Sequence, residues 1–231
     1  MLDPRRPDAK TRRRYLLFDL DGTIIDPAPG IIGSVRETLR ELGAEVPDVG
    51  ELRFVIGPPL RASFERLLGG TERVEQAVSL YRDRYGAGAM LDASPYDGIA
   101  EALRALGQRY ALLVATSKPY VFAKPILCHF KLERLFTAIH GAELDGRRDD
   151  KGELIGHLLE SEGLEPRQTL MVGDRSYDVL GAARHGISTI GVLWGHGSKA
   201  ELEAAGAAAL CQRPNELIGW VDAHLKLERL D

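Results

Sequence analysis

Hydrophobic residues along the chain form short uninterrupted runs that alternate with stretches of helical periodicity. The runs show no alternation of polar and apolar positions, which favours strands buried on both faces of a parallel sheet. They cover residues 15–18, 110–115, 136–140, 169–172 and 188–192. Helical spacing lies between them, at residues 99–106, 154–159 and 179–183. This order of strand and helix predicts an α/β fold with a doubly wound, mostly parallel sheet.

One stretch of the chain departs from this alternation, because between Asp26 and Pro95 the apolar residues follow helical spacing only. The predicted helices span residues 31–42, 60–67 and 74–85. Prolines at both boundaries indicate two connecting segments that could bend as a hinge; they are Pro27, Pro29 and Pro95. We therefore expect an inserted α-helical domain at residues 27–95 and an α/β core made of residues 15–26 and 96–231.

Composition places the chain in a broad class. With 231 residues, of which 44% are hydrophobic and 28% charged, it is typical of a globular protein that buries a large core. No apolar run approaches the roughly 18 residues of a membrane span, and no apolar signal segment precedes the first strand. We therefore expect a cytoplasmic protein without a membrane partner, either a monomer or a homodimer.

Charge is distributed unevenly along the chain. Residues 1–14 carry six basic residues against two acidic ones, although the whole chain has a net charge of -4. A basic leader alone does not make the basic face that nucleic-acid binding needs, so we expect disorder there and no nucleic-acid partner. The two cysteines, Cys128 and Cys211, lack metal-type spacing, and we expect each to be a buried, reduced thiol.

The most informative polar residues follow the first predicted strand. Asp19 and Asp21 stand two positions apart, and Gly22 and Thr23 complete a tight turn whose amides can cradle an anion. Two carboxylates this close repel each other, so either one is protonated or a cation lies between them. An Asx turn at the end of a strand is the structural alternative for such a pair.

A second acidic group, which contains Asp174 and Asp178, follows the predicted strand at residues 169–172. Because the carboxyl ends of parallel strands meet at one edge of a sheet, both acidic groups should lie there. Oxygen ligands without nearby histidine or cysteine favour Mg²⁺, which commonly takes phosphate oxygens as further ligands. The alternative for Asp178 is that it only stabilises the N-terminus of the following helix.

Two further elements suit a phosphate group. Thr116, Ser117 and Lys118 follow the strand at residues 110–115 and offer hydroxyls and amides to phosphate oxygens, although such residues also cap helices. Lys151 stands at the start of a predicted helix, where the helix dipole disfavours a cation that has no other partner. A solvated lysine is the simpler alternative there. Together with the acidic groups, these elements predict a site for a phosphorylated metabolite.

Taken in chain order, the four motifs resemble those of the haloacid dehalogenase superfamily of aspartyl-phosphate hydrolases, over essentially residues 15–225. The first is Asp19 to Thr23, the second is Thr116 with Ser117, the third is Lys151, and the fourth is Gly173-Asp174 with Asp178. The resemblance implies a Rossmann-like core with an inserted α-helical cap, which is the helical domain predicted above. It implies that Asp19 attacks phosphorus, and that Asp21 protonates the leaving alcohol and then activates water. An acid at position 21 implies phosphate ester chemistry rather than dehalogenation.

The resemblance also implies a ligand set. The ligands of Mg²⁺ would be Asp19, the Asp21 carbonyl, Asp174 and, through water, Asp178. The groups that hold the phosphoryl oxygens would be Thr116, Lys151 and the amides of Gly22 and Ser117. Thr23 and Lys118 belong to the same turns and are expected on the substrate side.

Residues 54–64 are similar to the substrate-facing loop and helix of phosphoglycolate-phosphatase-like members of this superfamily. There, Arg61 or Arg53 could contact an anionic leaving group, unless both arginines are solvated. Residues 194–198 are similar to a branch whose members are described as phosphoglycolate phosphatases or as 5′-nucleotidases. His196 lies in that segment, either as a loop histidine or as a substrate-side group.

These observations predict a Mg²⁺-dependent phosphatase that acts on a small phosphomonoester through an aspartyl-phosphate. The substrate class stays open between phosphoglycolate-like compounds and nucleoside monophosphates. A sugar-phosphate mutase is the enzymatic alternative, since it would use the same aspartyl-phosphate and return the phosphoryl group to the substrate. A phosphate-sensing or partner-binding protein without activity is the alternative outside enzymology.

Overall fold

The computed structural model describes residues 14–227. The predicted basic leader of residues 1–14 therefore lies outside the described residues, except for Arg14. Within residues 14–227, the model contains no helix that is both long and apolar enough to cross a membrane.

The centre of the molecule is a six-stranded sheet in the order β5-β4-β1-β6-β7-β8. Neighbouring strands in it pair in parallel. The strands are β1 (Tyr15–Phe18), β4 (Ala111–Pro119), β5 (Ala138–Ala142), β6 (Thr169–Gly173), β7 (Ser188–Val192) and β8 (Ala209–Cys211). This confirms the predicted α/β fold, although β8 was not expected, because a three-residue strand after an alanine-rich helix leaves little hydrophobic pattern.

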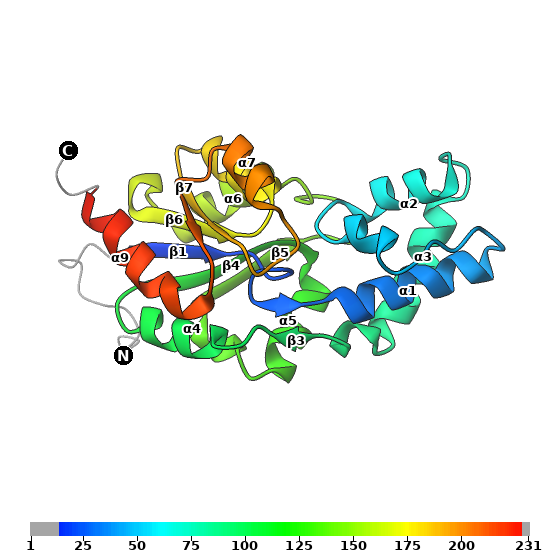
Figure 1. The fold of residues 1–231 in the computed structure, drawn as a ribbon, viewed down its shortest axis with the longest axis horizontal. Helices are drawn as coiled ribbons and strands as arrows, with labels where there is room; N and C mark the ends of the chain where they lie inside the picture. Colours follow the sequence, from blue (N-terminus) through cyan, green and yellow to red (C-terminus); the bar gives the residue numbers. More distant parts are fainter. Residues whose placement is uncertain (1–13, 228–231) are drawn as a thin grey trace.

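Alternate residues of each strand bury on opposite faces of the sheet. Leu16 and Phe18 of β1 pack into one cluster, whereas Leu17 packs into another. The first face is covered by α4 (Ile99–Gly107), α5 (Tyr120–His129) and α9 (Leu217–Leu227), and the second by α6 (Lys151–Glu162) and α7 (Ser176–Ala183) (Figure 1). Burial on both faces explains why the strands are continuously apolar in sequence.

The helical insertion gathers at one end of the long axis of the molecule (Figure 1). Its helices are α1 (Ala28–Glu41), α2 (Leu60–Leu68) and α3 (Val74–Gly86), with short 3-10 turns η1 (Glu51–Val55) and η2 (Ala89–Leu91). They enclose a hydrophobic cluster of their own, in which Phe64 packs edge-on against Tyr81. Full burial of one such aromatic side chain contributes roughly 1.5–3 kcal/mol. We refer to residues 27–95 as the cap.

The cap joins the core through two antiparallel segments, β2 (Ile25–Asp26) and β3 (Ser94–Pro95). At the start of the first cap helix, the Asp26 carboxylate accepts a hydrogen bond from the Ala28 N–H at 3.0 Å. The two short paired strands lie where the prolines predicted a pair of connecting segments.

The remaining elements complete the core. They are α8 (Lys199–Ala205) and the 3-10 turns η3 (Glu133–Leu135), η4 (Pro166–Gln168) and η5 (Pro214–Glu216). Both cysteines are free thiols, and Cys211 is buried as expected. The expectation of a buried Cys128 is wrong, since this thiol is exposed at the end of α5 and contacts Glu133.

Candidate active site

Residues at the carboxyl ends of three strands build the site. The strands are β1, β4 and β6, which are adjacent and in register, since Phe18 pairs with Val114 on one side and with Val172 on the other. Asp19 and Asp174 follow their strands, whereas Thr116, Ser117 and Lys118 belong to the last part of β4 itself. The Asp19 N–H extends this pairing with a hydrogen bond to the Val172 carbonyl at 3.0 Å. Residues that stand far apart in the sequence therefore meet at one end of the central strands.

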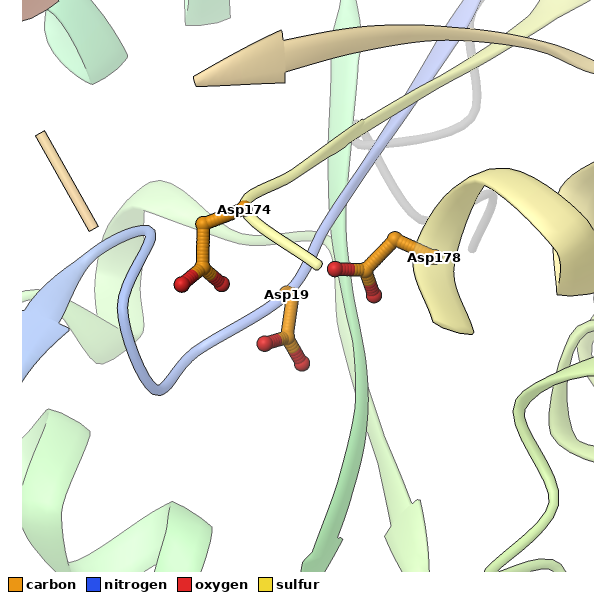
Figure 2. Close-up of side chains that lie close together, drawn as sticks. All are labelled: Asp19, Asp174 and Asp178. Atoms are coloured by element: carbon orange, nitrogen blue, oxygen red, sulfur yellow. The ribbon is translucent and has the colours of Figure 1, made fainter. Parts of the chain in front are cut away.

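Asp19, Asp174 and Asp178 bring one carboxylate oxygen each to within 4.8 Å of the others, and all three residues are buried (Figure 2). Burial raises the pKa of Asp174 well above its usual value, and the nearby charges of Asp178 and Asp19 raise it further. Burial also raises the pKa of Asp178, to about 6, although Lys151 opposes this shift. Three carboxylates this close are costly unless cations accompany them.

Lys151 is one such cation. Its ammonium lies 2.7 Å from Asp19 Oδ1 and 2.8 Å from Asp178 Oδ1, and it donates to the Ala115 carbonyl at 2.9 Å. Burial by itself would lower the pKa of Lys151, but the charges of Asp178 and Asp19 outweigh it and raise the pKa. These carboxylates are the partners that a lysine at the start of a helix requires.

Asp21 has a cation of its own. Its Oδ2 lies 2.9 Å from Lys118 Nζ, and the same ammonium hydrogen-bonds the hydroxyl of Tyr85, which comes from cap helix α3. Burial raises the pKa of Asp21, and Lys118 works against that rise. Lys118 was expected on the substrate side, and its ammonium contacts both Asp21 and the Tyr85 hydroxyl of the cap.

The turn after Asp21 supports the acidic group. Gly22 has a φ of +85°, and a Cβ there would lie 2.2 Å from Asp174 Oδ2. The Thr23 hydroxyl is 3.5 Å from Asp174 Oδ1. Among the described residues, neither Gly22 nor Thr23 lines the cavity reported below. Their predicted contact with substrate stays a prediction, while their contact with Asp174 is direct.

Thr116 and Ser117 belong to β4, which lies on the other side of β1 from β6. Thr116 is buried, and its hydroxyl oxygen accepts a hydrogen bond from the Lys118 N–H at 3.2 Å. Because that oxygen accepts this bond, its proton is free to point toward a phosphoryl oxygen. Both residues line the cavity above Asp19.

That cavity lies between core and cap. From the core it is lined by Asp19, Asp21, Thr116, Lys151 and Asp178. From the cap it is lined by Ile31, Leu60, Arg61, Tyr81, Arg82 and Tyr85. Arg61 is held there by Glu75, whose carboxylate lies 2.6 Å from its Nε. The wall facing the acidic residues is therefore apolar and aromatic, with two guanidinium groups.

His196 acts mainly through its backbone. Its N–H donates to Asp174 Oδ2 at 2.7 Å, and its ring lies 3.3 Å from the Asp26 carboxylate at the cap connection. Burial lowers the pKa of the His196 ring. Among the described residues, neither His196 nor Arg53 lines the cavity, so their contact with substrate stays a prediction.

The sequence analysis gave no role to two residues that connect the cap with the candidate site. Tyr85 was read only as part of an apolar helix face, and its hydroxyl contact with Lys118 has no signal in the sequence. Arg175 lies within the fourth motif, where it was given no role, and it contacts the backbone of Ile56 in the cap. The signal for Arg175 was a charged residue between two predicted metal ligands.

Residues 16–192 match the model of a family described as haloacid dehalogenase-like hydrolase. The chain belongs to this family. It is 49% identical to a Pseudomonas aeruginosa protein named 5′-nucleotidase, a match that covers 85% of this chain and 90% of that protein. It is 32% identical to a protein of Aquifex aeolicus named phosphoglycolate phosphatase, with coverage of 92% and 98%.

Other relatives widen the range of names within the family. A Mycobacterium tuberculosis protein named tyrosine-protein kinase PtkA is 42% identical over 80% of this chain, and the match spans 63% of that protein. The crystal structure of a predicted phosphatase from Clostridium acetobutylicum has a TM-score of 0.87 and 41% identity, covering 90% of this chain and 98% of that one. Family membership and the phosphatase names confirm the prediction of a haloacid dehalogenase-like phosphatase.

Proposed function

We propose that this haloacid dehalogenase-like protein is a Mg²⁺-dependent phosphatase that hydrolyses a small phosphomonoester through a phosphorylated Asp19. One observation carries the proposal. Asp19 lies on the floor of a cavity, its carboxylate is oriented by Lys151, and Asp21 is held two residues away by a separate cation. A nucleophile and a proton-transfer group thus face the same space with independent partners.

The acidic group fits a divalent cation. Asp19, Asp174 and Asp178 supply oxygen donors within 4.8 Å of one another. Three carboxylates and the Lys151 ammonium leave two negative charges in a buried site, which is the charge that one Mg²⁺ would balance. When bound, Mg²⁺ would supply charge stabilisation for the phosphoryl group during transfer. The residues that would hold it are these three aspartates and the carbonyl of Asp21.

In the first step, an Asp19 carboxylate oxygen attacks phosphorus and the bond from phosphorus to the leaving oxygen breaks. Lys151 orients Asp19 for this attack, because its ammonium pairs with that carboxylate at 2.7 Å inside the site. The Thr116 hydroxyl and the Ser117 amide are placed to donate to the phosphoryl oxygens as their negative charge spreads. The products of this step are an aspartyl-phosphate and a leaving group that needs a proton.

Asp21 supplies that proton to the leaving oxygen. In the second step, Asp21 accepts a proton from water as the water oxygen attacks phosphorus, and the bond between phosphorus and Asp19 breaks. Phosphate leaves and both aspartates return to their starting states. Lys118 fixes the direction in which the Asp21 carboxylate points during both transfers.

The cap is proposed to close over the substrate and to hold its leaving group. Ile31, Tyr81 and Tyr85 make its face of the cavity apolar and aromatic, which suits a nucleoside more than a glycolate. Arg61 and Arg82 lie on the same face and would favour an anionic leaving group such as glycolate. We propose nucleoside monophosphates as the first substrate class and phosphoglycolate as the second.

Phosphate release tests this function. The substrates are nucleoside monophosphates, phosphoglycolate, hexose phosphates and pyridoxal phosphate, each assayed with excess Mg²⁺ and again with excess chelator. We expect Mg²⁺-dependent release that Asp19→Asn abolishes, with circular dichroism of the variant unchanged. Release by Asp19→Asn would refute the nucleophile. Isomerisation of a hexose 1-phosphate without phosphate release would indicate a mutase instead.

A further inference from the structure

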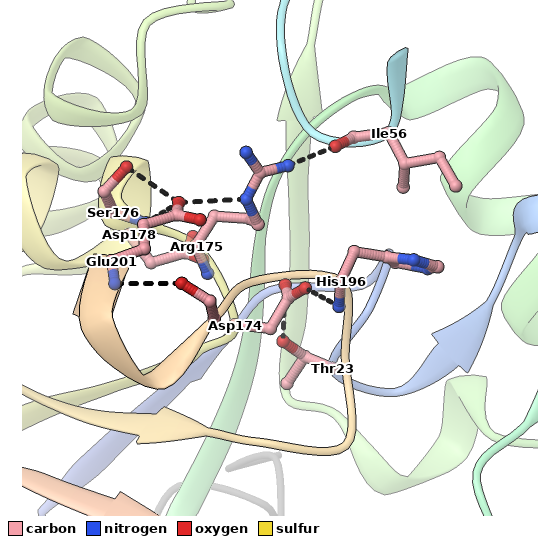
Figure 3. Close-up of polar contacts among 9 residues, drawn as sticks. Thr23, Ile56, Asp174, Arg175, Ser176, Asp178, His196 and Glu201 are labelled. Atoms are coloured by element: carbon pink, nitrogen blue, oxygen red, sulfur yellow. Dashed lines mark hydrogen bonds and ion pairs between the residues drawn. The ribbon is translucent and has the colours of Figure 1, made fainter. Parts of the chain in front are cut away.

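Arg175 occupies an unusual position between the metal-type aspartates and the cap. It directly follows Asp174 and precedes α7, and its backbone N–H donates to Asp178 Oδ2 at 3.1 Å. Its side chain lines the cavity and reaches across to the cap, where a guanidinium nitrogen donates to the carbonyl of Ile56 (Figure 3). One residue therefore touches both the acidic group, through its backbone, and the cap, through its side chain.

The guanidinium is held in place from behind by Glu201 in α8. Arg175 Nε donates to Glu201 Oε1 at 3.0 Å, and the same oxygen accepts from the N–H and the hydroxyl of Ser176, each at 2.9 Å (Figure 3). Ser198 in turn caps the first turn of α8 by accepting from the Glu201 N–H at 3.0 Å. With its stem and Nε fixed, the outer end of Arg175 has a defined direction toward the cap.

The cap segment that contacts Arg175 has the backbone conformation and the space that this contact requires. Ile56 is buried, and Gly57 follows it with a φ of +107°. A Cβ on Gly57 would lie 2.8 Å from the Arg175 guanidinium, so the glycine provides both the backbone conformation and the space. The chain then continues through Pro58 and Pro59 into the residues that line the cavity. We call residues 56–60 the cap loop.

We propose that Arg175 is a positioning residue that docks the cap loop over Asp19 and thereby sets the affinity for substrates with a large leaving group. The inference rests on the proposed phosphatase function. The guanidinium acts on the backbone of the cap loop, and the cap loop forms part of the wall against which a leaving group would pack. Lys118 and Tyr85 join core and cap at another point of the cavity, so the cap stays attached when the Arg175 contact is lost.

The kinetic test compares a large with a minimal leaving group. Arg175→Met keeps the aliphatic stem and removes the donors, and it is assayed with a nucleoside monophosphate and with acetyl phosphate. We expect kcat/KM for the nucleoside monophosphate to fall at least tenfold more than for acetyl phosphate, mainly through KM. Equal losses on the two substrates would overturn the proposal, because they would assign Arg175 to the acidic group rather than to the cap loop.

Arg213→Met is the matched control, since Arg213 also pairs with a glutamate through Nε, at 2.8 Å, but does so on Glu216 in the core. This variant should leave the ratio of kcat/KM for the nucleoside monophosphate to kcat/KM for acetyl phosphate unchanged. Glu201→Gln provides a second variant in case Arg175→Met folds poorly. Glu201→Gln weakens the contact between Glu201 and Arg175 without changing a cap residue. It should lower the same kcat/KM ratio as Arg175→Met does, but by a smaller factor.

Hydrogen exchange supplies a readout that does not depend on turnover. In Arg175→Met, the amides of residues 54–57 and of Leu60 should exchange at least fivefold faster than in the original chain, while those of α1 and α3 should keep their rates. Unchanged exchange at these five amides would overturn the docking. If the original chain releases no phosphate from either substrate, the proposed function fails, and the exchange result still decides whether Arg175 docks the cap loop.

Discussion

Lys118 lies 2.9 Å from Asp21, and its ammonium also contacts the hydroxyl of Tyr85. This single cation therefore connects the proposed proton-transfer group of the core with a helix of the cap. Both partners are largely buried, so the ion pair is poorly screened by solvent. The orientation of Asp21 and the position of the cap are thus coupled through one side chain.

Replacing Lys118 by methionine should impair both fold and reaction. The variant leaves the Asp21 carboxylate buried without its cation, which should lower the free energy of unfolding by ~3 kcal/mol. Loss of the oriented proton-transfer group should lower kcat by about 10²-fold. Urea unfolding and steady-state kinetics measure the two effects, and a variant with the original kcat would show that Lys118 does not position Asp21.

Tyr85→Phe is the matched control for that variant. It removes the hydroxyl contact and keeps the ion pair with Asp21, so kcat should fall only by about tenfold, the equivalent of the roughly 1.5 kcal/mol that a hydrogen bond to a charged group contributes. A larger loss than in Lys118→Met would assign the main role to the tyrosine.

Gly22→Ala should be far more damaging than the same change at Gly43. Both glycines have positive φ, +85° and +61°, so both substitutions carry backbone strain of about 1 kcal/mol. At Gly22 the new Cβ would also meet Asp174 Oδ2 at 2.2 Å, whereas at Gly43 it would meet nothing within 4 Å. Gly22→Ala should lose Mg²⁺-dependent activity, and Gly43→Ala should keep it. Equal activity of the two variants would contradict a role of the turn in holding Asp174.

Mg²⁺ should stabilise the folded protein through the acidic group. At a Mg²⁺ concentration of 100 times its Kd, linkage gives about 2.7 kcal/mol, which raises the Tm by roughly 5–10 °C in a protein of this size. Asp174→Asn should abolish this rise without lowering the Tm of the metal-free protein, since it removes one of three adjacent carboxylates. Calorimetry with and without chelator measures both. An undiminished rise in Asp174→Asn would exclude Asp174 as a ligand.

Lowering the pH should weaken the ion pair between Glu201 and Arg175. Burial alone would raise the pKa of Glu201, but hydrogen bonds from Ser176 and Arg175 outweigh it and lower the pKa below 4.5. A carboxyl whose pKa is lower in the folded state contributes stability that is present above the pKa of the unfolded chain and is lost as the pH falls through the folded value. The original chain should therefore lose more stability than Glu201→Gln between pH 5 and 3, roughly the range around the glutamate pKa. Urea unfolding at several pH values measures this, and parallel curves would contradict it.

The local pattern of the chain was enough to predict the sheet and most of its helices. The runs before Asp19, Thr116 and Asp174 are continuously apolar, which only strands covered on both faces require. The polar residues at the ends of these runs supply the motifs, and the motifs with their order indicated the haloacid dehalogenase-like family. Strand β8 escaped prediction because three residues at the edge of a sheet carry too little pattern.

The positions of the cations were harder to predict. The sequence indicated Lys118 and Lys151 as groups near a phosphate, but their partners Asp21 and Asp19 lie 97 and 132 residues away in the chain, and Tyr85, another partner of Lys118, belongs to the cap. Tyr85 fitted the apolar face of a helix, and nothing in its neighbourhood marks the hydroxyl as a contact of Lys118. Pairings of this kind depend on how segments that are distant in the sequence pack together.

Hydrophobic periodicity and turn chemistry act between near neighbours, so the sequence alone was enough to predict the sheet strands other than β8, the helices other than α5, α8 and α9, and the set of acidic residues. The contacts of the cations depend on the folded arrangement instead: Lys151 pairs with Asp19 and Asp178, Lys118 pairs with Asp21, and Arg175 contacts the cap. The physical reason is that burial makes an unpaired charge costly, so each cation takes the partner that the packing of core and cap brings within reach.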